Sequence, residues 1–290
     1  MSNIDLIIEE RAADIGNFMV GRLLPFRQKR AVGPFVFLDH MGPEKLAASE
    51  NLDVPPHPHI GLSTLTYLFK GAILHRDSIG SVQEITPGAV NWMTAGKGVV
   101  HSERTPDNLR GKEKELHGMQ IWVALPKNME NIAPAFTHIP ANEIPSWEEN
   151  GIHFKLIAGE AFQKKSPVPV YSKMYFVEIK STQKAKLKIE DQIFGESALY
   201  ILKGSIKSDG NTYESNHILV AKESSLCAFE IQENSTIYIF GGEPFPEERY
   251  INWNFVSSDK KVIEKAKEDW INGKFVEIPH ENERVPHPSE

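Results

Sequence analysis

The sequence predicts an all-β protein built from two related halves. The chain has 290 residues, and its 19 Pro and 20 Gly repeatedly interrupt short apolar stretches, as is typical of strands joined by turns. The segment 199–206 (Leu-Tyr-Ile-Leu-Lys-Gly-Ser-Ile) repeats the pattern of 66–73 (Thr-Tyr-Leu-Phe-Lys-Gly-Ala-Ile), which indicates an internal duplication. One stretch alone has convincing helical spacing, so helices should be few.

In the first half, strands are expected over residues 33–40, 63–74, 89–94, 99–101 and 118–125. The stretch 63–74 alternates Thr, Tyr and Phe around Lys70-Gly71, which predicts two strands joined by a tight turn. Residues 134–169 contain several prolines and suit a linker between two domains. We therefore expect an N-terminal domain over 1–136 and a C-terminal domain, including the linker, over 137–290.

The predicted helix covers Lys260–Asn272, near the end of the chain. Ser257-Ser258-Asp259 precedes it, and Gly273 follows it, as expected for helix boundaries. Apolar residues recur at helical spacing at Val262, Ile263, Ala266, Trp270 and Ile271. We expect this helix to cover a β-structure with its apolar face, and the polar tail 279–290 to be mobile.

Composition limits the classes of function. Hydrophobic residues make up 40% of the chain and charged residues 24%, as in soluble globular proteins. The net charge is −7, and lysines alternate with acidic residues, which argues against direct nucleic-acid binding. No segment approaches the ~20 apolar residues of a membrane span, and the N-terminus lacks a secretory pattern. The single cysteine, Cys227, excludes an internal disulfide, so we expect a cytoplasmic protein with a buried structural thiol.

Two short motifs predict a metal site. They are His57-Pro58-His59 and His101-Ser102-Glu103. In an extended strand, residues i and i+2 point to the same face, so each motif aims two side chains in one direction. Three imidazoles and one carboxylate suit Fe, Mn, Ni, Co, Cu or Zn, and an octahedral ion would keep two positions open for chemistry. Either motif alone could also be a chance feature of the surface.

The second half does not repeat these motifs. When the first half is shifted by the offset of the duplication, Glu190 and Gln192 replace the first histidine pair, and no His-x-Glu occurs near Asn234. The second copy is therefore expected to lack metal and to be structural or regulatory. His75 and His117 lie beside predicted strands, where they could either orient metal ligands or be structural histidines.

With these segments assembled, the chain resembles the pirin family, the two-domain branch of the cupins. The resemblance spans nearly the whole chain and is most specific in the blocks 92–98 (Trp-Met-Thr-Ala-Gly-Lys-Gly) and 101–103 (His-Ser-Glu). It implies a bicupin, in which two jelly-roll β-barrels pack face to face. It also implies one divalent metal in the N-terminal barrel, with Fe(II) as the expected ion, on His57, His59, His101 and Glu103.

The resemblance implies a metal-dependent quercetin 2,3-dioxygenase, an oxidoreductase that acts on flavonol-like aromatic substrates with dioxygen. In such a reaction, the flavonol 3-hydroxyl loses a proton and binds the metal, and the ring opens with loss of carbon monoxide. Glu103 would serve as ligand and proton acceptor. The alternative is an iron-dependent regulatory protein that modulates a protein partner, either in transcription or in metabolism.

Overall fold

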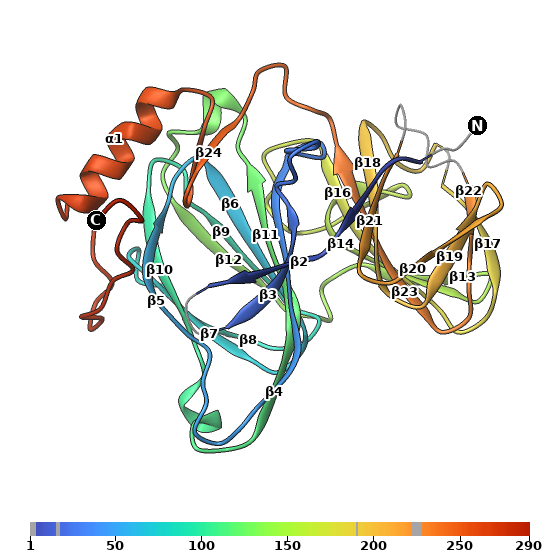
Figure 1. Ribbon diagram of the computed structural model, residues 1–290, viewed down its shortest axis with the longest axis horizontal. Helices are drawn as coiled ribbons and strands as arrows, with labels where there is room; N and C mark the ends of the chain where they lie inside the picture. Colours follow the sequence, from blue (N-terminus) through green and yellow to red (C-terminus); the bar gives the residue numbers. More distant parts are fainter. Residues whose placement is uncertain (1–3, 16–17, 190, 222–227) are drawn as a thin grey trace. The chain divides into compact units, whose positions relative to one another are not determined.

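The computed structural model describes residues 4–15, 18–189, 191–221 and 228–290 (Figure 1). Its contacts divide the chain into two compact units. The histidine unit comprises Ala12–Gly21, Leu38–Ala141 and Pro246–Glu290, and the companion unit comprises Met1–Arg11, Arg22–Phe37 and Asn142–Phe245. The C-terminal segment, which was expected in the second domain, therefore groups with the half that carries the predicted metal ligands.

The histidine unit contains two large antiparallel sheets and a small two-stranded one. Its larger sheet has the order β12 (Ala135–Ile139), β9 (Val90–Thr94), β6 (Leu62–Lys70), β11 (Lys114–Ala124), β4 (Phe35–Leu46), β3 (Met19–Leu24) and β2 (Arg11–Asp14). Its smaller sheet has the order β5 (Asp53–His59), β10 (Val99–Arg104), β7 (Ile73–Asp77) and β8 (Val82–Ile85). Leu68 and Met41 from the larger sheet pack with Ile73 and Ile85 from the smaller one in a shared core. Two 3₁₀ turns, Asp107–Leu109 and Lys127–Met129, lie in its loops.

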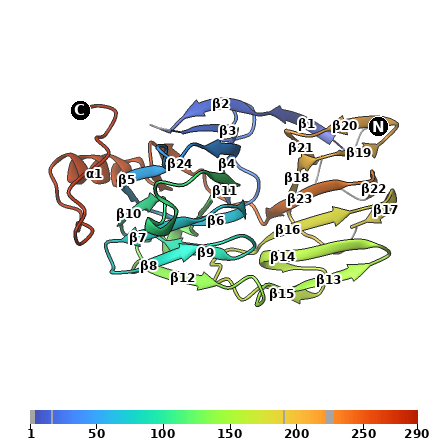
Figure 2. The same cartoon turned by 90° about the horizontal axis from the view of Figure 1, so that it is seen from below.

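The companion unit follows the same plan. Its larger sheet has the order β1 (Ile4–Glu9), β21 (His217–Ala221), β18 (Glu196–Lys203), β23 (Ser235–Gly242), β16 (Met174–Ser181), β14 (Ile152–Ala161) and β13 (Ser146–Glu149), and β15 (Lys164–Lys165) pairs with β14 (Figure 2). Its smaller sheet has the order β17 (Ala185–Lys188), β22 (Ala228–Ile231), β19 (Ser205–Ser208) and β20 (Asn211–Glu214). The all-β bicupin prediction is confirmed, although the sheets remain open rather than closing into barrels. The predicted linker, residues 134–169, instead contains four strands, β12 to β15.

The duplicated segments occupy equivalent places in the two units. Gly71 joins β6 to β7, and Gly204 joins β18 to β19. Both glycines adopt positive φ, 83° and 77°, in a region that other residues rarely enter. A Cβ on either glycine would come within 2.2 Å of a neighbouring oxygen, that of Glu115 or of Ser235. The Lys-Gly pattern shared by the two halves therefore reflects the same tight turn in both.

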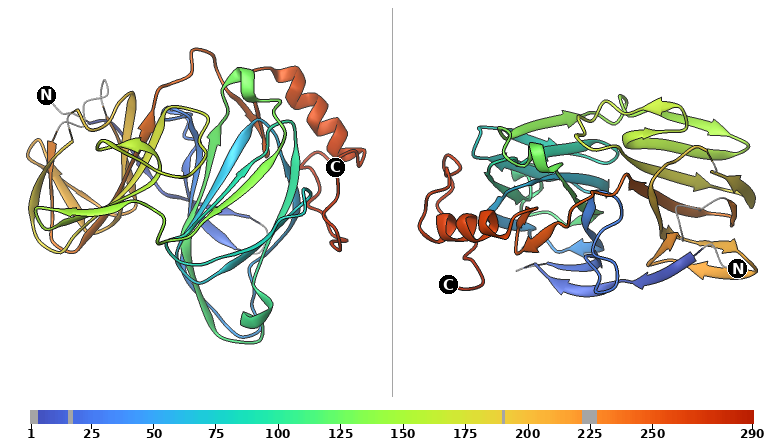
Figure 3. Two further views of the ribbon diagram at one scale, coloured as in Figure 1. Left: turned by 180° about the vertical axis from the view of Figure 1, so that it is seen from behind. Right: turned by 90° about the horizontal axis from the view of Figure 1, so that it is seen from above.

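The helix α1 (Lys260–Ile271) is confirmed almost to the residue, and it lies at the outside of the histidine unit (Figure 3). The Asp259 carboxylate accepts a hydrogen bond from the Lys261 N–H at 2.8 Å and so caps the first turn. Ile263, Ala266 and Trp270 pack against Phe255 and Val100. The strands β24 (Tyr250–Asn252) and β25 (Phe255–Ser257) lead into the helix. The described part of the chain contains no helix long and apolar enough to cross a membrane.

The tail was predicted to be mobile, whereas the structure packs it against the smaller sheet. The Val285 N–H donates to the Pro56 carbonyl on β5 at 2.9 Å, and the Trp270 indole donates to the Val285 carbonyl at 3.1 Å. The Glu281 carboxylate accepts from the Ser102 hydroxyl at 2.9 Å and pairs with Arg104. Polar composition suggested a solvated segment, whereas these long-range contacts hold the tail against the smaller sheet.

Candidate metal centre

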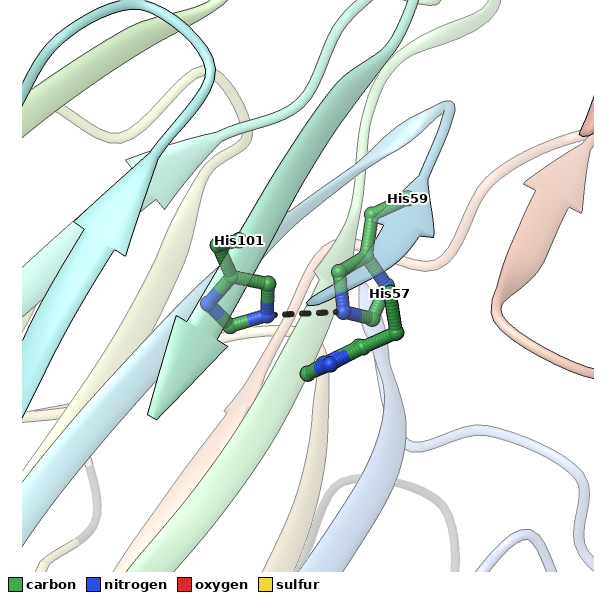
Figure 4. A group of neighbouring side chains, drawn as sticks. All are labelled: His57, His59 and His101. Carbon is green, nitrogen blue, oxygen red and sulfur yellow. Dashed lines mark hydrogen bonds between the residues drawn. The ribbon is translucent and has the colours of Figure 1, made fainter. Parts of the chain in front are cut away.

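Three of the four predicted ligands converge inside the histidine unit (Figure 4). Strands β5 and β10 are antiparallel neighbours, and His101 lies directly opposite His57 in their register. One nitrogen each of His57, His59 and His101 lies within 4.8 Å of the other two, and the Nε2 atoms of His59 and His101 are 3.1 Å apart. All three side chains are buried, with at most 8% exposed. The i, i+2 spacing thus works as predicted, because it places both β5 histidines on the inner face.

The second ring nitrogens show where the protons lie. His57 Nδ1 is 2.9 Å from the Pro55 carbonyl oxygen, and His59 Nδ1 is 3.2 Å from that of Asn254. A carbonyl oxygen only accepts, so both Nδ1 atoms carry hydrogen and both Nε2 atoms present bare lone pairs. His101 directs its Nε2 at the same point, 3.1 Å from His59 Nε2, so the two nitrogens require either a shared proton or a bound cation between them. The donor set therefore fits a metal ion, which neutral imidazoles bind through such nitrogens.

Burial keeps these imidazoles neutral. Loss of hydration lowers the pKa of His57 to about 4, and the hydrogen bond to Pro55 opposes this only in part. The pKa values of His59 and His101 are also lowered, first by burial and then by the neighbouring histidines. Neutral imidazole is the form that coordinates metals, so no proton has to be displaced near neutral pH.

Glu103 lies near these histidines but not within their cluster. Among the described residues, the group whose ligand atoms lie within 4.8 Å of one another contains the three histidines without Glu103. The Thr66 hydroxyl is 3.4 Å from Glu103 Oε1 and 2.8 Å from Gln120 Oε1. Burial raises the pKa of Glu103 to about 7, with the Thr66 hydrogen bond acting in the opposite direction. Its role as the fourth ligand stays a prediction.

Several residues around the centre were missed or left undecided by the sequence analysis. Trp122 lies edge-on to His59, with ring centroids 5.1 Å apart. His75 Nδ1 is 3.4 Å from His101 Nδ1, so His75 contacts a predicted ligand directly. His117 instead pairs with His40, with their Nε2 atoms 2.8 Å apart. The Asn254 contact could not be found locally, because Asn254 acts through its backbone and is 195 residues from His59.

The companion unit has apolar residues where the histidine unit has its three clustered histidines. Strand β22 pairs with β17 and β19 just as β10 pairs with β5 and β7. Its inward residues are Phe229 and Ile231, which pack with Leu187 of β17 in an apolar core. Shifting the first half by the constant offset of the duplication instead places Gln192 and Asn234 at the positions of His59 and His101. Both residues lie outside these strands. Glu190 and Cys227, also named in the sequence analysis, lie outside the described residues.

Two such two-sheet units, one of them with three inward histidines that could hold a metal ion, define a cupin architecture. Comparisons with known proteins narrow this class. The family model named Pirin matches residues 17–123, and the model named Pirin C-terminal cupin domain matches residues 175–276. The chain belongs to the pirin family.

Individual relatives match along most of the chain. It is 49% identical over 278 residues to a pirin-like protein of Caulobacter vibrioides, covering 94% of each chain. A crystal structure of quercetin 2,3-dioxygenase from Acinetobacter baumannii superposes with a TM-score of 0.88 at 35% identity, covering 98% of this chain and 94% of that one. The bacterial pirin YhhW from Escherichia coli, solved in complex with nickel(II), has the same fold at 18% identity, with a TM-score of 0.62 and 82% and 99% coverage.

Proposed function

We propose that the protein is a non-haem metal enzyme that cleaves flavonols by a quercetin 2,3-dioxygenase type of reaction in the histidine unit. The observation that carries this proposal is the convergence of one buried ring nitrogen from each of His57, His59 and His101. The similarity to a structure of quercetin 2,3-dioxygenase supports the choice of substrate class. We further propose Fe(II) as the metal, with Mn, Ni, Co, Cu and Zn as alternatives to be distinguished by analysis.

The proposed site assigns separate tasks to the chain's own residues. His57, His59 and His101 would hold the ion, and Glu103 would be the fourth ligand. When bound, the metal would supply a Lewis-acid site for an ionised hydroxyl and for the redox chemistry of dioxygen. The Glu103 carboxylate would accept the proton of the flavonol 3-hydroxyl, and the Thr66 hydroxyl lies 3.4 Å from this carboxylate and can orient it. Burial of the histidines would keep bulk water from the ligands.

The test is a turnover assay with the purified protein and excess flavonol. Elemental analysis first identifies the metal and its stoichiometry. Quercetin is then titrated anaerobically, and dioxygen is added while flavonol loss and carbon monoxide release are measured. We expect one carbon monoxide per flavonol and many turnovers per metal ion, and no reaction in a metal-stripped control. Fully loaded protein without turnover would contradict the proposal and favour the regulatory alternative.

A further inference from the structure

Two further buried residues, His75 and Asp77 on β7, lie behind His101, on the side away from the histidine cluster. The two side chains are at most 5% exposed, and the His75 ring stacks on Phe136 with centroids 4.4 Å apart. His75 Nδ1 faces His101 Nδ1 at 3.4 Å, and His75 Nε2 lies 3.0 Å from Asp77 Oδ2. Three side chains therefore form a line from the His cluster to a buried carboxylate.

The carboxylate at the end of this line has a fixed orientation. Asp77 Oδ1 accepts the backbone N–H of Ile79 at 3.1 Å and that of Ser81 at 2.8 Å. Oδ2 is therefore the oxygen left to face His75. Burial alone would raise the pKa of Asp77, but hydrogen bonds from His75 and Ser81 outweigh burial and lower this pKa below its usual value. The group thus presents a negative charge to His75.

One arrangement of protons satisfies both contacts of His75 with neutral rings. In it, His101 Nδ1–H donates to His75 Nδ1, and His75 Nε2–H donates to Asp77. The reverse arrangement would make His75 donate through Nδ1, which leaves its Nε2 either bare against a carboxylate or protonated in a cationic ring. It would also move the His101 proton to Nε2, among the metal-binding lone pairs. The first arrangement alone leaves Nε2 of His101 free.

We propose that His75 and Asp77 are positioning residues that hold His101 in its metal-binding tautomer. Through His75, the negative charge of Asp77 would also raise the basicity of the His101 ring. This proposal rests on metal binding by the histidine cluster, as the proposed function does. His57 and His59 donate to backbone carbonyls, whereas His101 donates to a side chain. The His101 ligand is therefore the one whose supporting acceptor a substitution can change. A carboxylate behind a ligating imidazole raises the basicity of the ligand.

Asp77→Asn is the sharpest substitution, because the backbone amides of Ile79 and Ser81 should retain the amide oxygen of Asn in the place of Oδ1. Its NH2 group then faces His75 Nε2, which must accept, so the His75 proton moves to Nδ1. That proton opposes His101 Nδ1–H and drives the His101 proton to Nε2. We expect metal affinity to fall by about 10- to 100-fold.

The test uses Zn(II), which is diamagnetic, as the probe. Chelator competition measures affinity, and ¹⁵N NMR of the histidine rings reports which nitrogen carries each proton. Asp53→Asn is the matched control: it removes one charge from β5 of the same sheet, where Asp53 pairs with Arg110 at 2.6 Å. We expect this control to bind Zn(II) within about twofold of the wild type, since Asp53 and Arg110 are not part of the hydrogen-bonded series His101–His75–Asp77.

Two results would overturn the proposal. One is a wild-type, zinc-loaded protein in which His75 carries its proton on Nδ1, a result that holds even if the Asp77 variant fails to fold. The other is an Asp77→Asn protein with the affinity of the Asp53→Asn control. Wild-type protein that binds no Zn(II) would remove the metal centre and this proposal together. If the tautomers and affinities are as expected but no flavonol is turned over, the positioning role of His75 and Asp77 is supported and the dioxygenase function alone is contradicted.

Discussion

The two units share a scaffold and differ in what fills it. In the histidine unit, the inner faces of β5 and β10 carry His57, His59 and His101, whereas β17 and β22 of the companion unit carry Leu187, Phe229 and Ile231 at the corresponding strands. Buried imidazoles lose hydration, and each requires a hydrogen-bond partner or an ion. Aliphatic and aromatic side chains gain free energy from the same burial. The difference indicates that the two-sheet plan does not depend on the metal ligands.

The outer faces of the two smaller sheets also differ. In the histidine unit, Val100 and Ser102 are buried beneath α1 and the tail. In the companion unit, Lys186, Lys188 and Lys207 of β17 and β19 are exposed. The strands that carry the three histidines are thus covered on their outer face by α1 and the tail, whereas the outer face of the companion strands is exposed to solvent. Local rigidity is what a metal site needs to keep its ligands within reach of one ion.

The largest expected effect comes from His101→Ala. Wild-type protein should hold about one ion per chain after dialysis, and the variant should hold none and lose all flavonol cleavage, because both the ligand and its link to His75 disappear. Metal analysis and carbon monoxide release are the measurements. Apo-protein stability, followed by thermal unfolding, serves as the control for folding. Stoichiometric metal in the variant would place the ion elsewhere and break the comparison between the two units.

Phe229→Ala tests the opposite side of the comparison. Phe229 is 4% exposed in the apolar core of the companion unit, so its truncation leaves a cavity. We expect the free energy of unfolding to fall by about 3–5 kcal/mol, with the metal content of folded protein unchanged. Urea unfolding and elemental analysis measure the two quantities. Loss of metal at unchanged stability would mean that the companion core acts on the centre.

Sequence patterns predicted those features that depend on local spacing. Helix α1 and the turns at Gly71 and Gly204 follow from residues a few positions apart, and so does the convergence of His57 and His59 on one face. The corresponding positions in the companion unit were missed, because eight residues, 188–195, separate Leu187 from the start of β18, whereas two separate His59 from β6. A constant offset cannot account for such a change in loop length.

Contacts between distant segments could not be predicted. The tail is polar, yet Glu281 meets Ser102 across 179 residues. Asn254 supports His59 through a backbone oxygen, which any residue type could supply. His75 looked the same as a structural histidine, since its link to His101 depends on the pairing of β7 with β10.

Glu103→Gln should have an intermediate effect. The substitution keeps the size of the side chain and one oxygen donor but removes the charge and the proton acceptor. We expect partial metal retention and a loss of turnover on the order of 10²-fold, measured per bound ion. Thr66→Val is a useful companion variant, because it removes the hydroxyl that lies 3.4 Å from this carboxylate without changing a ligand. Unchanged turnover in metal-loaded Glu103→Gln protein would exclude Glu103 as the base.

The smallest effect should come from Glu281→Gln, which tests whether the tail stabilises the unit that carries the ligands. The side chain of Glu281 is 9% exposed and pairs with Arg104, and its Oε1 also lies 4.0 Å from Arg76 Nη1. We therefore expect a loss of about 1–2 kcal/mol in the free energy of unfolding near neutral pH. Glu283→Gln is the matched control, because Glu283 binds the same Arg104 at 2.9 Å but is 64% exposed, and it should change stability by less than about 0.5 kcal/mol.

The difference between wild type and Glu281→Gln should also depend on pH. Burial would raise the pKa of Glu281, but hydrogen bonds from Arg104 and Ser102 lower it below its usual value in the folded protein. A carboxyl whose folded pKa is depressed stabilises the fold fully above its unfolded pKa of ~4.3, and this contribution is lost as pH falls through the folded value. Urea unfolding should therefore show a constant difference between about pH 6 and 8 that shrinks below about pH 4. A difference that persists at the acid end would mean that Glu281 acts through packing, and that the charge on the tail does not stabilise the covered sheet.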